Sequence, residues 1–205
     1  METPTLTLTL TLTLALTLDG EQATTPTTTT TTRRGRGSGA PPPLSMAECA
    51  SFMDAAGRIT NPPALRQRAF EGGVEAAARA VVWPLLLGVS CMESTAAERT
   101  ALRDRKRAEY CTLRSQWQSI SPAQEGNWSK WRERKARVDK DVVRTDRTQP
   151  YFAGPQHSPA APTAVTATLR SILLSHVFYH WDLGYCQGMS DLLAPVLFVV
   201  RALGP

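Results

Sequence analysis

The chain has 205 residues, enough for one ordinary domain with tails, and it carries 23 Lys and Arg against 18 Asp and Glu, a net charge of +5. Its most apolar run, residues 192–200, is short and contains Pro195, whereas a membrane-spanning helix needs about 20 apolar residues. A membrane span is therefore not expected. The start, Met1-Glu2, has no basic region of the kind that opens a secretory signal peptide, so we expect none.

Cysteine usage excludes two further classes. The four cysteines are scattered without a C-x-x-C pair, and the three histidines lie near no paired thiols. A zinc site or a disulfide framework would need closely spaced ligands or paired spacings. The sequence predicts reduced thiols of the kind found in the cytosol.

Residues 1–43 are of low complexity. Thr and Leu alternate over residues 5–18, Thr dominates 24–32, and Arg, Gly, Ser and Pro make up 33–43. Alternation is formally a strand pattern, but no comparable strand follows with which it could pair. We therefore predict a disordered tail without an assigned function.

Helical signals begin after residue 44. Asn61-Pro62-Pro63 is expected to break the chain, and short helical spacing follows over 64–70. Residues 74–87 repeat apolar side chains at i, i+3 and i+4 spacing, which predicts an amphipathic helix. Thr95 and Glu98 form a capping box that opens a long polar helix to about Trp117.

The later segments alternate between helices and turns. In chain order, the patterns predict a loop over 121–127, a basic helix over 128–141, a Pro-rich loop over 150–162, a helix over 168–181, a turn over 184–188 and a final apolar helix capped by Ser190. No convincing strand pattern occurs after residue 43. The fold class is predicted to be all-α.

Positive charge is concentrated in residues 101–147, which hold 13 Lys and Arg against 7 Asp and Glu. Such a stretch is typical of a solvated helix face, an anionic partner or a membrane surface. Single-stranded nucleic acid needs aromatic side chains for base stacking among the basic residues, and only Trp128 and Trp131 lie near the basic stretch 130–140. Nucleic acid is therefore disfavoured as a partner.

The first chemical motif lies at the end of the basic helix. Asp141 and Arg144 are three residues apart and share a helix face, and Val138 lies one turn earlier and can anchor that face in a core. An arginine held by a carboxylate has a fixed orientation and is always charged, so it can stabilise an anionic transition state. The alternative is an ordinary ion pair on a wet helix face.

The second motif is the turn over 184–188. Tyr185 and Met189 are interpreted as apolar residues that bracket the turn, and Gly188 lets the backbone approach a partner closely. The amide of Gln187 has the chemistry to orient an attacking water beside a phosphate. The alternative is a turn that only starts a helix, with Ser190 as its N-cap.

Together the two motifs resemble the signature of TBC-domain Rab GTPase-activating proteins. Val138-x-x-Asp141-x-x-Arg144 matches its first element with Val in place of Ile, and Tyr185-Cys186-Gln187-Gly188 matches its second element intact. Flanking segments resemble the family too; these are 70–88, 146–147, 151–152 and 189–195. Two further segments, 51–60 and 116–120, especially resemble the branch of type-15 and type-17 TBC proteins.

The resemblance implies a site and a partner. Arg144 would be an arginine finger on the γ-phosphate, Gln187 would orient the water, and Asp141 would hold Arg144, with Val138, Tyr185 and Gly188 supporting them. The partner would be a Rab small GTPase that itself binds GTP and Mg²⁺, so this chain would be an activator without a cofactor of its own. The resemblance also implies a role in vesicle trafficking and a cytoplasmic location that reaches endomembranes only through the Rab.

The resemblance further implies that residues 44–205 are the N-terminal part of a longer helical TBC domain, truncated at its C-terminal end. Two hypotheses follow. The chain is a working activator with both side chains in place, or it is a truncated fragment that binds or regulates a Rab without accelerating hydrolysis.

Overall fold

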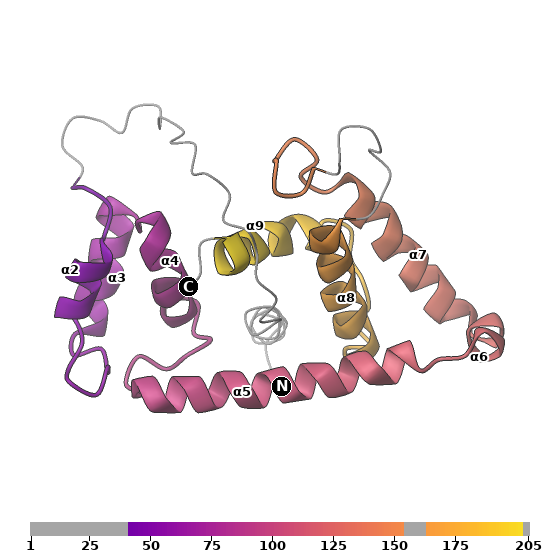
Figure 1. Ribbon diagram of the computed structural model, residues 1–205, viewed down its shortest axis with the longest axis horizontal. Helices are drawn as coiled ribbons and strands as arrows, with labels where there is room; N and C mark the ends of the chain where they lie inside the picture. Colours follow the sequence, from indigo (N-terminus) through magenta and orange to yellow (C-terminus); the bar gives the residue numbers. More distant parts are fainter. Residues whose placement is uncertain (1–40, 154–162, 203–205) are drawn as a thin grey trace. The chain divides into compact units, whose positions relative to one another are not determined.

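The computed structural model describes residues 41–153 and 163–202 (Figure 1). Within these ranges every regular element is an α-helix, and the only β-type pairings are the isolated bridges Leu44–Val74 and Met53–Ile59. The predicted all-α class is therefore confirmed. Most of the predicted tail, residues 1–43, and residues 154–162 of the predicted Pro-rich loop lie outside the described residues.

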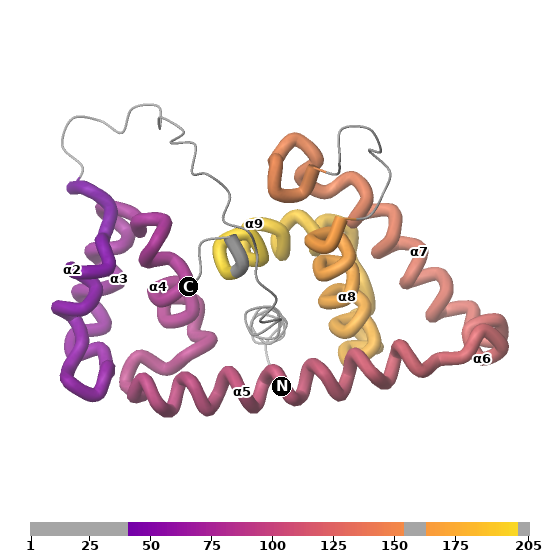
Figure 2. The backbone as a smooth tube through the Cα atoms, viewed as in Figure 1, coloured from indigo at the N-terminus to yellow at the C-terminus, as the bar shows by residue number. Residues whose placement is uncertain are grey.

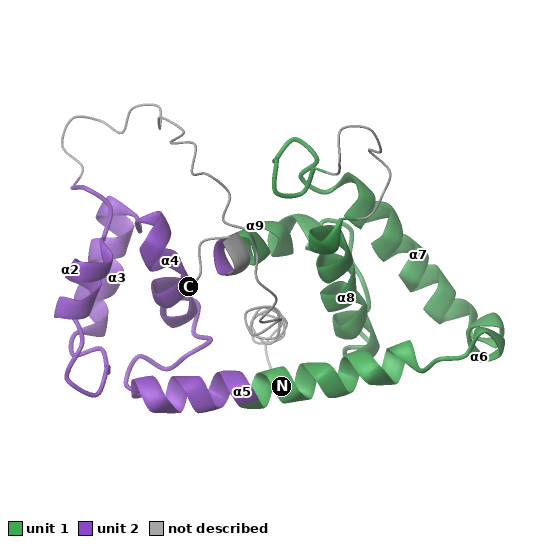
Figure 3. Ribbon diagram, in the orientation of Figure 1, with its two compact units in different colours: residues 1–18, 105–198 green, residues 19–104, 199–205 purple. Residues whose placement is uncertain are grey.

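The described chain forms two compact units, coloured separately in Figure 3. One comprises residues 105–198, and the other comprises residues 41–104 together with 199–202. The boundary falls within helix α5 (Ala96–Gln118). The assignment of residues 44–205 to a single TBC domain stays a prediction.

The unit that begins the described chain is built from α2 (Met46–Ser51), α3 (Pro62–Gly72), α4 (Ala76–Leu86) and the start of α5. Its core is a cluster of small and medium apolar side chains: Leu44, Cys49, Ile59, Leu65, Ala78, Val82, Leu85 and Met92. An ion pair between Arg68 and Glu48, with a shortest N–O distance of 2.6 Å, ties α3 to α2.

The segment Asn61-Pro62-Pro63 starts a helix, although we expected it to break the chain. The Asn61 side chain accepts a hydrogen bond from the Ala64 N–H at 3.1 Å, and the prolines occupy the first turn of α3. Proline is suited to that position because the first turn has no intrahelical acceptor for its missing N–H.

The capping box that opens α5 is confirmed. The Glu98 N–H donates to Thr95 Oγ1 at 3.1 Å, and the Thr95 N–H donates to a Glu98 carboxylate oxygen at 2.7 Å. These two bonds satisfy donors that the first helical turn leaves without partners. The helix continues to Gln118, close to the predicted end at Trp117.

The predicted loop over 121–127 is wrong, because residues Pro122–Asn127 form the short helix α6. Ser121 caps this helix, and the Gln124 side chain accepts from the Ser121 N–H at 2.8 Å. The sequence contained this capping box, with a proline at the first helical position, and its length of only six residues concealed it.

Helix α8 (Ala164–Tyr179) lies at the centre of the unit formed by residues 105–198. Figure 2 shows the path of the chain through α7 (Ser129–Arg144), α8 and α9 (Met189–Ala202). The Tyr110 and Ser171 hydroxyls lie 2.9 Å apart and join α5 to α8, and Asp139 accepts from Arg170 at 2.5 Å and joins α7 to α8. Seven consecutive residues of α8, 171–177, are buried, so the helix is covered over most of its circumference.

The core of this unit is largely aliphatic, and it includes a group of aromatic side chains around Trp131. Its buried members are Tyr110, Trp131, Val138, Val142, Phe152, Leu169, Ile172, Leu173, Leu174, Val177, Tyr185, Leu193, Ala194 and Leu197. Trp131 approaches the rings of Trp117, Trp128 and Phe178 with centroid distances of 6.0 to 6.5 Å. Such tilted and edge-to-face pairs stabilise a core beyond the area that they bury.

Several helix ends differ from expectation. Helix α7 continues past Asp141 to Arg144, and α8 starts at Ala164 because Thr163 and Thr166 cap each other reciprocally. Helix α9 starts at Met189, so the prediction that Ser190 is its N-cap is wrong. The Gly188 carbonyl accepts the first bonds of α9 instead, and Ser190 lies buried in the first turn.

Among residues 41–153 and 163–202, no helix has both the length and the apolar character needed to cross a bilayer.

We predict that Leu174→Ala lowers the free energy of unfolding by about 2–5 kcal/mol, because Leu174 is fully buried in α8 and its truncation leaves a cavity. Urea denaturation followed by circular dichroism measures the change. The matched control is Leu192→Ala, since Leu192 lies on α9 with 62% of its surface exposed. It should shift stability by about 0.5 kcal/mol or less. Equal effects of the two substitutions would contradict this assignment of the core.

Candidate functional site

The last turns of α7 carry the first motif. Val138 is fully buried in the core, and Asp141 is only 6% exposed. Arg144 ends the helix, and 60% of its side chain is exposed. The helical repeat therefore places an anchor, a buried carboxylate and an exposed guanidinium in successive turns.

The Asp141 carboxylate joins the two motifs. Its Oδ1 accepts a hydrogen bond from Arg144 Nη2 at 2.5 Å, and its Oδ2 accepts from the Tyr185 hydroxyl at 2.7 Å and from the Gly188 N–H at 3.4 Å. Asp141 and Tyr185 are 44 positions apart in the chain. The structure thus brings the end of α7 and the 184–188 turn together around one carboxylate.

These partners keep Asp141 ionised. Burial acts to raise its pKa, but the hydrogen bonds from Tyr185, Arg144 and the Gly188 N–H, together with the Arg144 charge, outweigh burial and hold the pKa below its ordinary value of 3.8. A buried carboxylate without such donors would strongly destabilise the fold. The carboxylate therefore needs both motifs in place.

Two glycines shape the turn. Gly184 and Gly188 have φ angles of 65° and 92°, in the left-handed region that other L-residues rarely adopt. The turn at Gly188 presents its N–H to Asp141, and its carbonyl starts α9. A β-carbon at either position would strain the backbone that carries Tyr185 and Gln187.

The sequence-based interpretation of Tyr185 as an apolar bracket was incomplete. Its ring is buried, but its hydroxyl donates to Asp141. Burial, followed by the nearby Asp141 carboxylate, raises the pKa of Tyr185 to about 12 against a lowering influence from Ser190. The phenol therefore stays protonated and acts as a donor at every physiological pH.

Gln187 and Cys186 form the exposed tip of the turn. Arg144 and Gln187 thus both face solvent, while the residues that hold their backbones are buried. The Cys186 N–H contacts Met189 Sδ at 3.5 Å. The predicted catalytic roles of Arg144 and Gln187, and the supporting roles of the other motif residues, stay predictions.

One contributor was missed from the sequence. Thr145 follows the motif arginine and is 2% exposed. Its N–H and its hydroxyl donate to the Asp141 carbonyl at 3.0 and 2.8 Å, which closes the C-terminus of α7. A hydroxyl residue directly after the motif arginine is the signal that indicates this cap.

The geometry weighs against the alternative of an ordinary surface ion pair. In such a pair both side chains are exposed and the attraction is worth only tenths of a kcal/mol. Here the carboxylate is buried with three donors, and only the guanidinium is exposed. The buried Asp141 carboxylate is therefore fixed in place, and it holds an Arg144 guanidinium that remains exposed to solvent.

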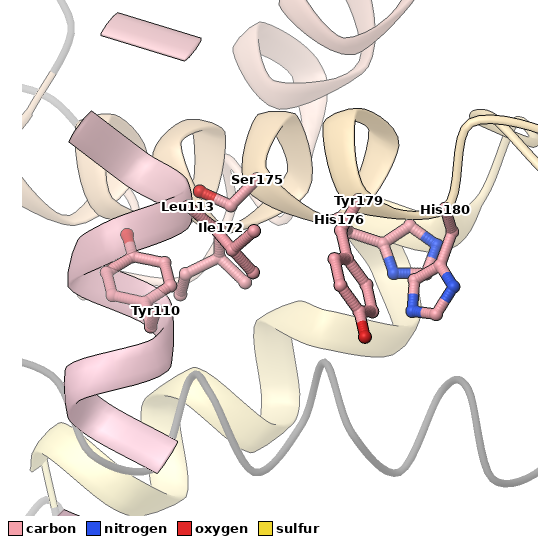
Figure 4. A pocket seen from close by; sticks show the side chains of 7 residues that line it. All are labelled: Tyr110, Leu113, Ile172, Ser175, His176, Tyr179 and His180. Atoms are coloured by element: carbon pink, nitrogen blue, oxygen red, sulfur yellow. The ribbon is translucent and has the colours of Figure 1, made fainter. Parts of the chain in front are cut away.

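A second group of titratable side chains lies between α5 and α8, around a cavity of about 10 Å³ (Figure 4). The rings of His176 and His180 lie side by side with centroids 4.8 Å apart, and Tyr179 meets His180 edge-to-face. Burial and the His180 charge lower the pKa of His176 to about 4, so it is neutral at physiological pH. The cavity is the size of a single water, which makes this group part of the packing.

The described residues contain no group of three or more His, Cys, Asp or Glu placed to hold a metal ion.

Comparisons with known proteins agree with this architecture. The family model described as "Rab-GTPase-TBC domain" matches residues 76–202, more than half of the chain. TBC1 domain family member 17 of Homo sapiens is 39% identical over 160 residues, and TBC1 domain family member 25 of Homo sapiens is 40% identical over 159 residues; each match covers 78% of this chain. The GTPase-activating protein gyp7 of Schizosaccharomyces pombe is 35% identical over 163 residues, 75% of this chain.

The chain belongs to the Rab-GTPase-TBC domain family. The resemblance drawn from the two motifs is thereby confirmed. The chain spans about a quarter of the length of these relatives, between 22% and 24% of each.

We predict that Asp141→Asn lowers the free energy of unfolding by about 1.5–3 kcal/mol at neutral pH, because it removes the charge that accepts three hydrogen bonds. The folded-state pKa of Asp141 lies below 3.8, so its stabilisation is complete above that pH and is lost as pH falls through the lowered pKa. The difference between variant and wild type should therefore shrink in acid. Urea titrations at several pH values measure it.

Asp139→Asn is the matched control, because its carboxylate is 42% exposed and pairs across the surface with Arg170. It should cost about 1 kcal/mol or less. A pH-independent deficit in Asp141→Asn, or equal deficits in the two variants, would contradict the role given to Asp141.

Proposed function

We propose that this chain activates a Rab-family small GTPase by supplying Arg144 and Gln187 in trans to the bound GTP. The observation that carries the proposal is the Asp141 carboxylate, which accepts hydrogen bonds from both motifs. It binds the exposed Arg144 side chain directly, and it binds Tyr185 and Gly188 on both sides of the exposed Gln187. Membership of the Rab-GTPase-TBC domain family and the name of the gyp7 relative, a GTPase-activating protein, support the same activity.

Arg144 is the proposed arginine finger. A guanidinium placed on the γ-phosphate neutralises charge that develops as the phosphoryl group transfers. Its Nη2 is bound to Asp141, which limits the rotamers of a side chain that is otherwise exposed. Preorganisation of this kind lets the cation act without first losing conformational freedom.

Gln187 is the proposed water-orienting residue. Its side-chain carbonyl can accept a hydrogen bond from the attacking water, and its side-chain NH2 can donate one to a phosphate oxygen. The bond from the Gly188 N–H to Asp141 fixes the backbone directly after it. Gln187 would then act from this chain in the place of a glutamine of the GTPase.

The proposed partner brings the rest of the chemistry. GTP and Mg²⁺ would both be held by the GTPase, so the chain needs no cofactor of its own and is an activator of an enzyme. We propose that it acts in vesicle trafficking from a cytoplasmic location and meets endomembranes only through the Rab. Nucleic acid has no part in this function.

Two exposed apolar side chains lie close in sequence to the proposed catalytic residues. Val143 precedes Arg144 and is 54% exposed, and Leu192 lies on the first turn of α9 with 62% exposed. An exposed apolar side chain gains free energy when a protein partner covers it and removes it from water. We propose that both contact the GTPase.

We predict that Arg144→Ala lowers the stimulated rate of GTP hydrolysis about 10³-fold or more, because it removes the charge on the γ-phosphate. Gln187→Ala should also abolish most of the stimulation, since the water loses its orienting group. Single-turnover hydrolysis on a panel of purified Rab proteins, with and without the full chain, measures both effects.

Arg137→Ala is the matched control, because Arg137 lies on the same helix, is 59% exposed and pairs only with Glu133 in the described contacts. It should leave the rate unchanged. Full stimulation by Arg144→Ala would overturn the proposal. Binding of a Rab without any acceleration by the unaltered chain would favour a regulatory, non-catalytic fragment instead.

A further inference from the structure

Arg134 of α7 lies against Trp181, which precedes the turn carrying Gln187, and against Gly184, the first residue of that turn. The Arg134 guanidinium carbon lies 4.1 Å from the centroid of the Trp181 ring, and Nη1 donates a hydrogen bond to the Trp181 carbonyl. Trp181 also packs against Trp128, with ring centroids 4.9 Å apart. The Arg134 guanidinium therefore contacts both the ring and the backbone carbonyl of Trp181.

The same guanidinium lies against Gly184. A β-carbon built at Gly184 would be 3.1 Å from Arg134 Cζ, and Gly184 has a φ of 65°. Gly184 is buried, and its N–H donates to the His180 carbonyl at 2.8 Å. The backbone at Gly184 is thus held by its hydrogen bond to the His180 carbonyl and by the Arg134 guanidinium packed against it.

Arg134 and Asp141 are seven residues apart on α7 and so project from the same face, about 10 Å apart along the helix axis. Asp141 binds the Tyr185–Gly188 end of the segment, and Arg134 binds the Trp181–Gly184 end. One rigid helix therefore holds the segment at two places. Arg134 contacts its N-terminal part, and Asp141 contacts the residues on both sides of Cys186 and Gln187.

We propose that Arg134 is a positioning residue for Gln187. This inference rests on the proposed function, in which Gln187 orients the attacking water. Arg134 touches neither nucleotide nor water and acts through the Trp181–Gly184 backbone. A planar guanidinium suits this position because it stacks on an indole face and donates in its own plane at the same time.

The experiment compares Arg134→Met in the full chain with Arg137→Met as control, since both remove one charge from α7 and keep a similar apolar stem. Arg134→Met should lower the maximal stimulated rate about tenfold with little change in the Rab concentration that gives half the effect. Arg137→Met should leave both quantities unchanged. Arg134→Lys should recover part of the rate, because its charge can still lie over Trp181.

A double-mutant cycle tests the route of action. If Arg134 acts through Gln187, adding Arg134→Met to Gln187→Ala should lower the residual rate by about twofold or less. A tenfold further loss in that background, or full activity of Arg134→Met alone, would overturn the inference.

Amide hydrogen exchange gives a readout that needs no GTPase. The Gly184 and Gly188 amides should exchange faster in Arg134→Met than in Arg137→Met, because the segment loses one of its two attachments. Unchanged exchange at both glycines would overturn the positioning role. If the unaltered chain stimulated no Rab, the proposed function would fail, and the exchange rates would still decide whether Arg134 holds the turn.

Discussion

The arrangement of the site depends on one buried charge. A carboxylate whose side chain is only 8% exposed needs donors around it, and Asp141 has them in Arg144, Tyr185 and Gly188. These donors come from two segments that the chain separates by a Pro-rich stretch and a whole helix. The need to satisfy this carboxylate is therefore the physical reason that the end of α7 and the 184–188 turn lie together.

Helix α7 is the rigid element behind this site. Its buried face carries Trp131, Val138 and Val142 into the core, so the helix cannot rotate or slide without loss of packing. The polar residues on that helix, Arg134 and Asp141, therefore have fixed positions along its axis. Flexible side chains at the surface gain precision when their backbones are attached to a packed helix rather than to a free loop.

Local signals predicted most helices correctly, because caps and apolar periodicity act over a few residues. The capping box of α5 and the buried face of α8 followed directly from such patterns. The errors occurred where periodicity has too few residues to register, as in α6, or where a backbone carbonyl took the role expected of a side chain, as Gly188 did at the start of α9. Helix ends are decided by such single hydrogen bonds.

The sequence by itself determined the all-α class, the family and the two motifs, since these depend on local spacing and on residue identities. It also indicated that Asp141 and Arg144 share a helix face. Only the tertiary structure decided that Asp141 is buried, that the Tyr185 hydroxyl points to it, and that Arg134 contacts Trp181 and Gly184. Those contacts join residues more than 40 positions apart, and helical periodicity carries no information on which faces meet. The packing of α7 against α8 and the turn determines them.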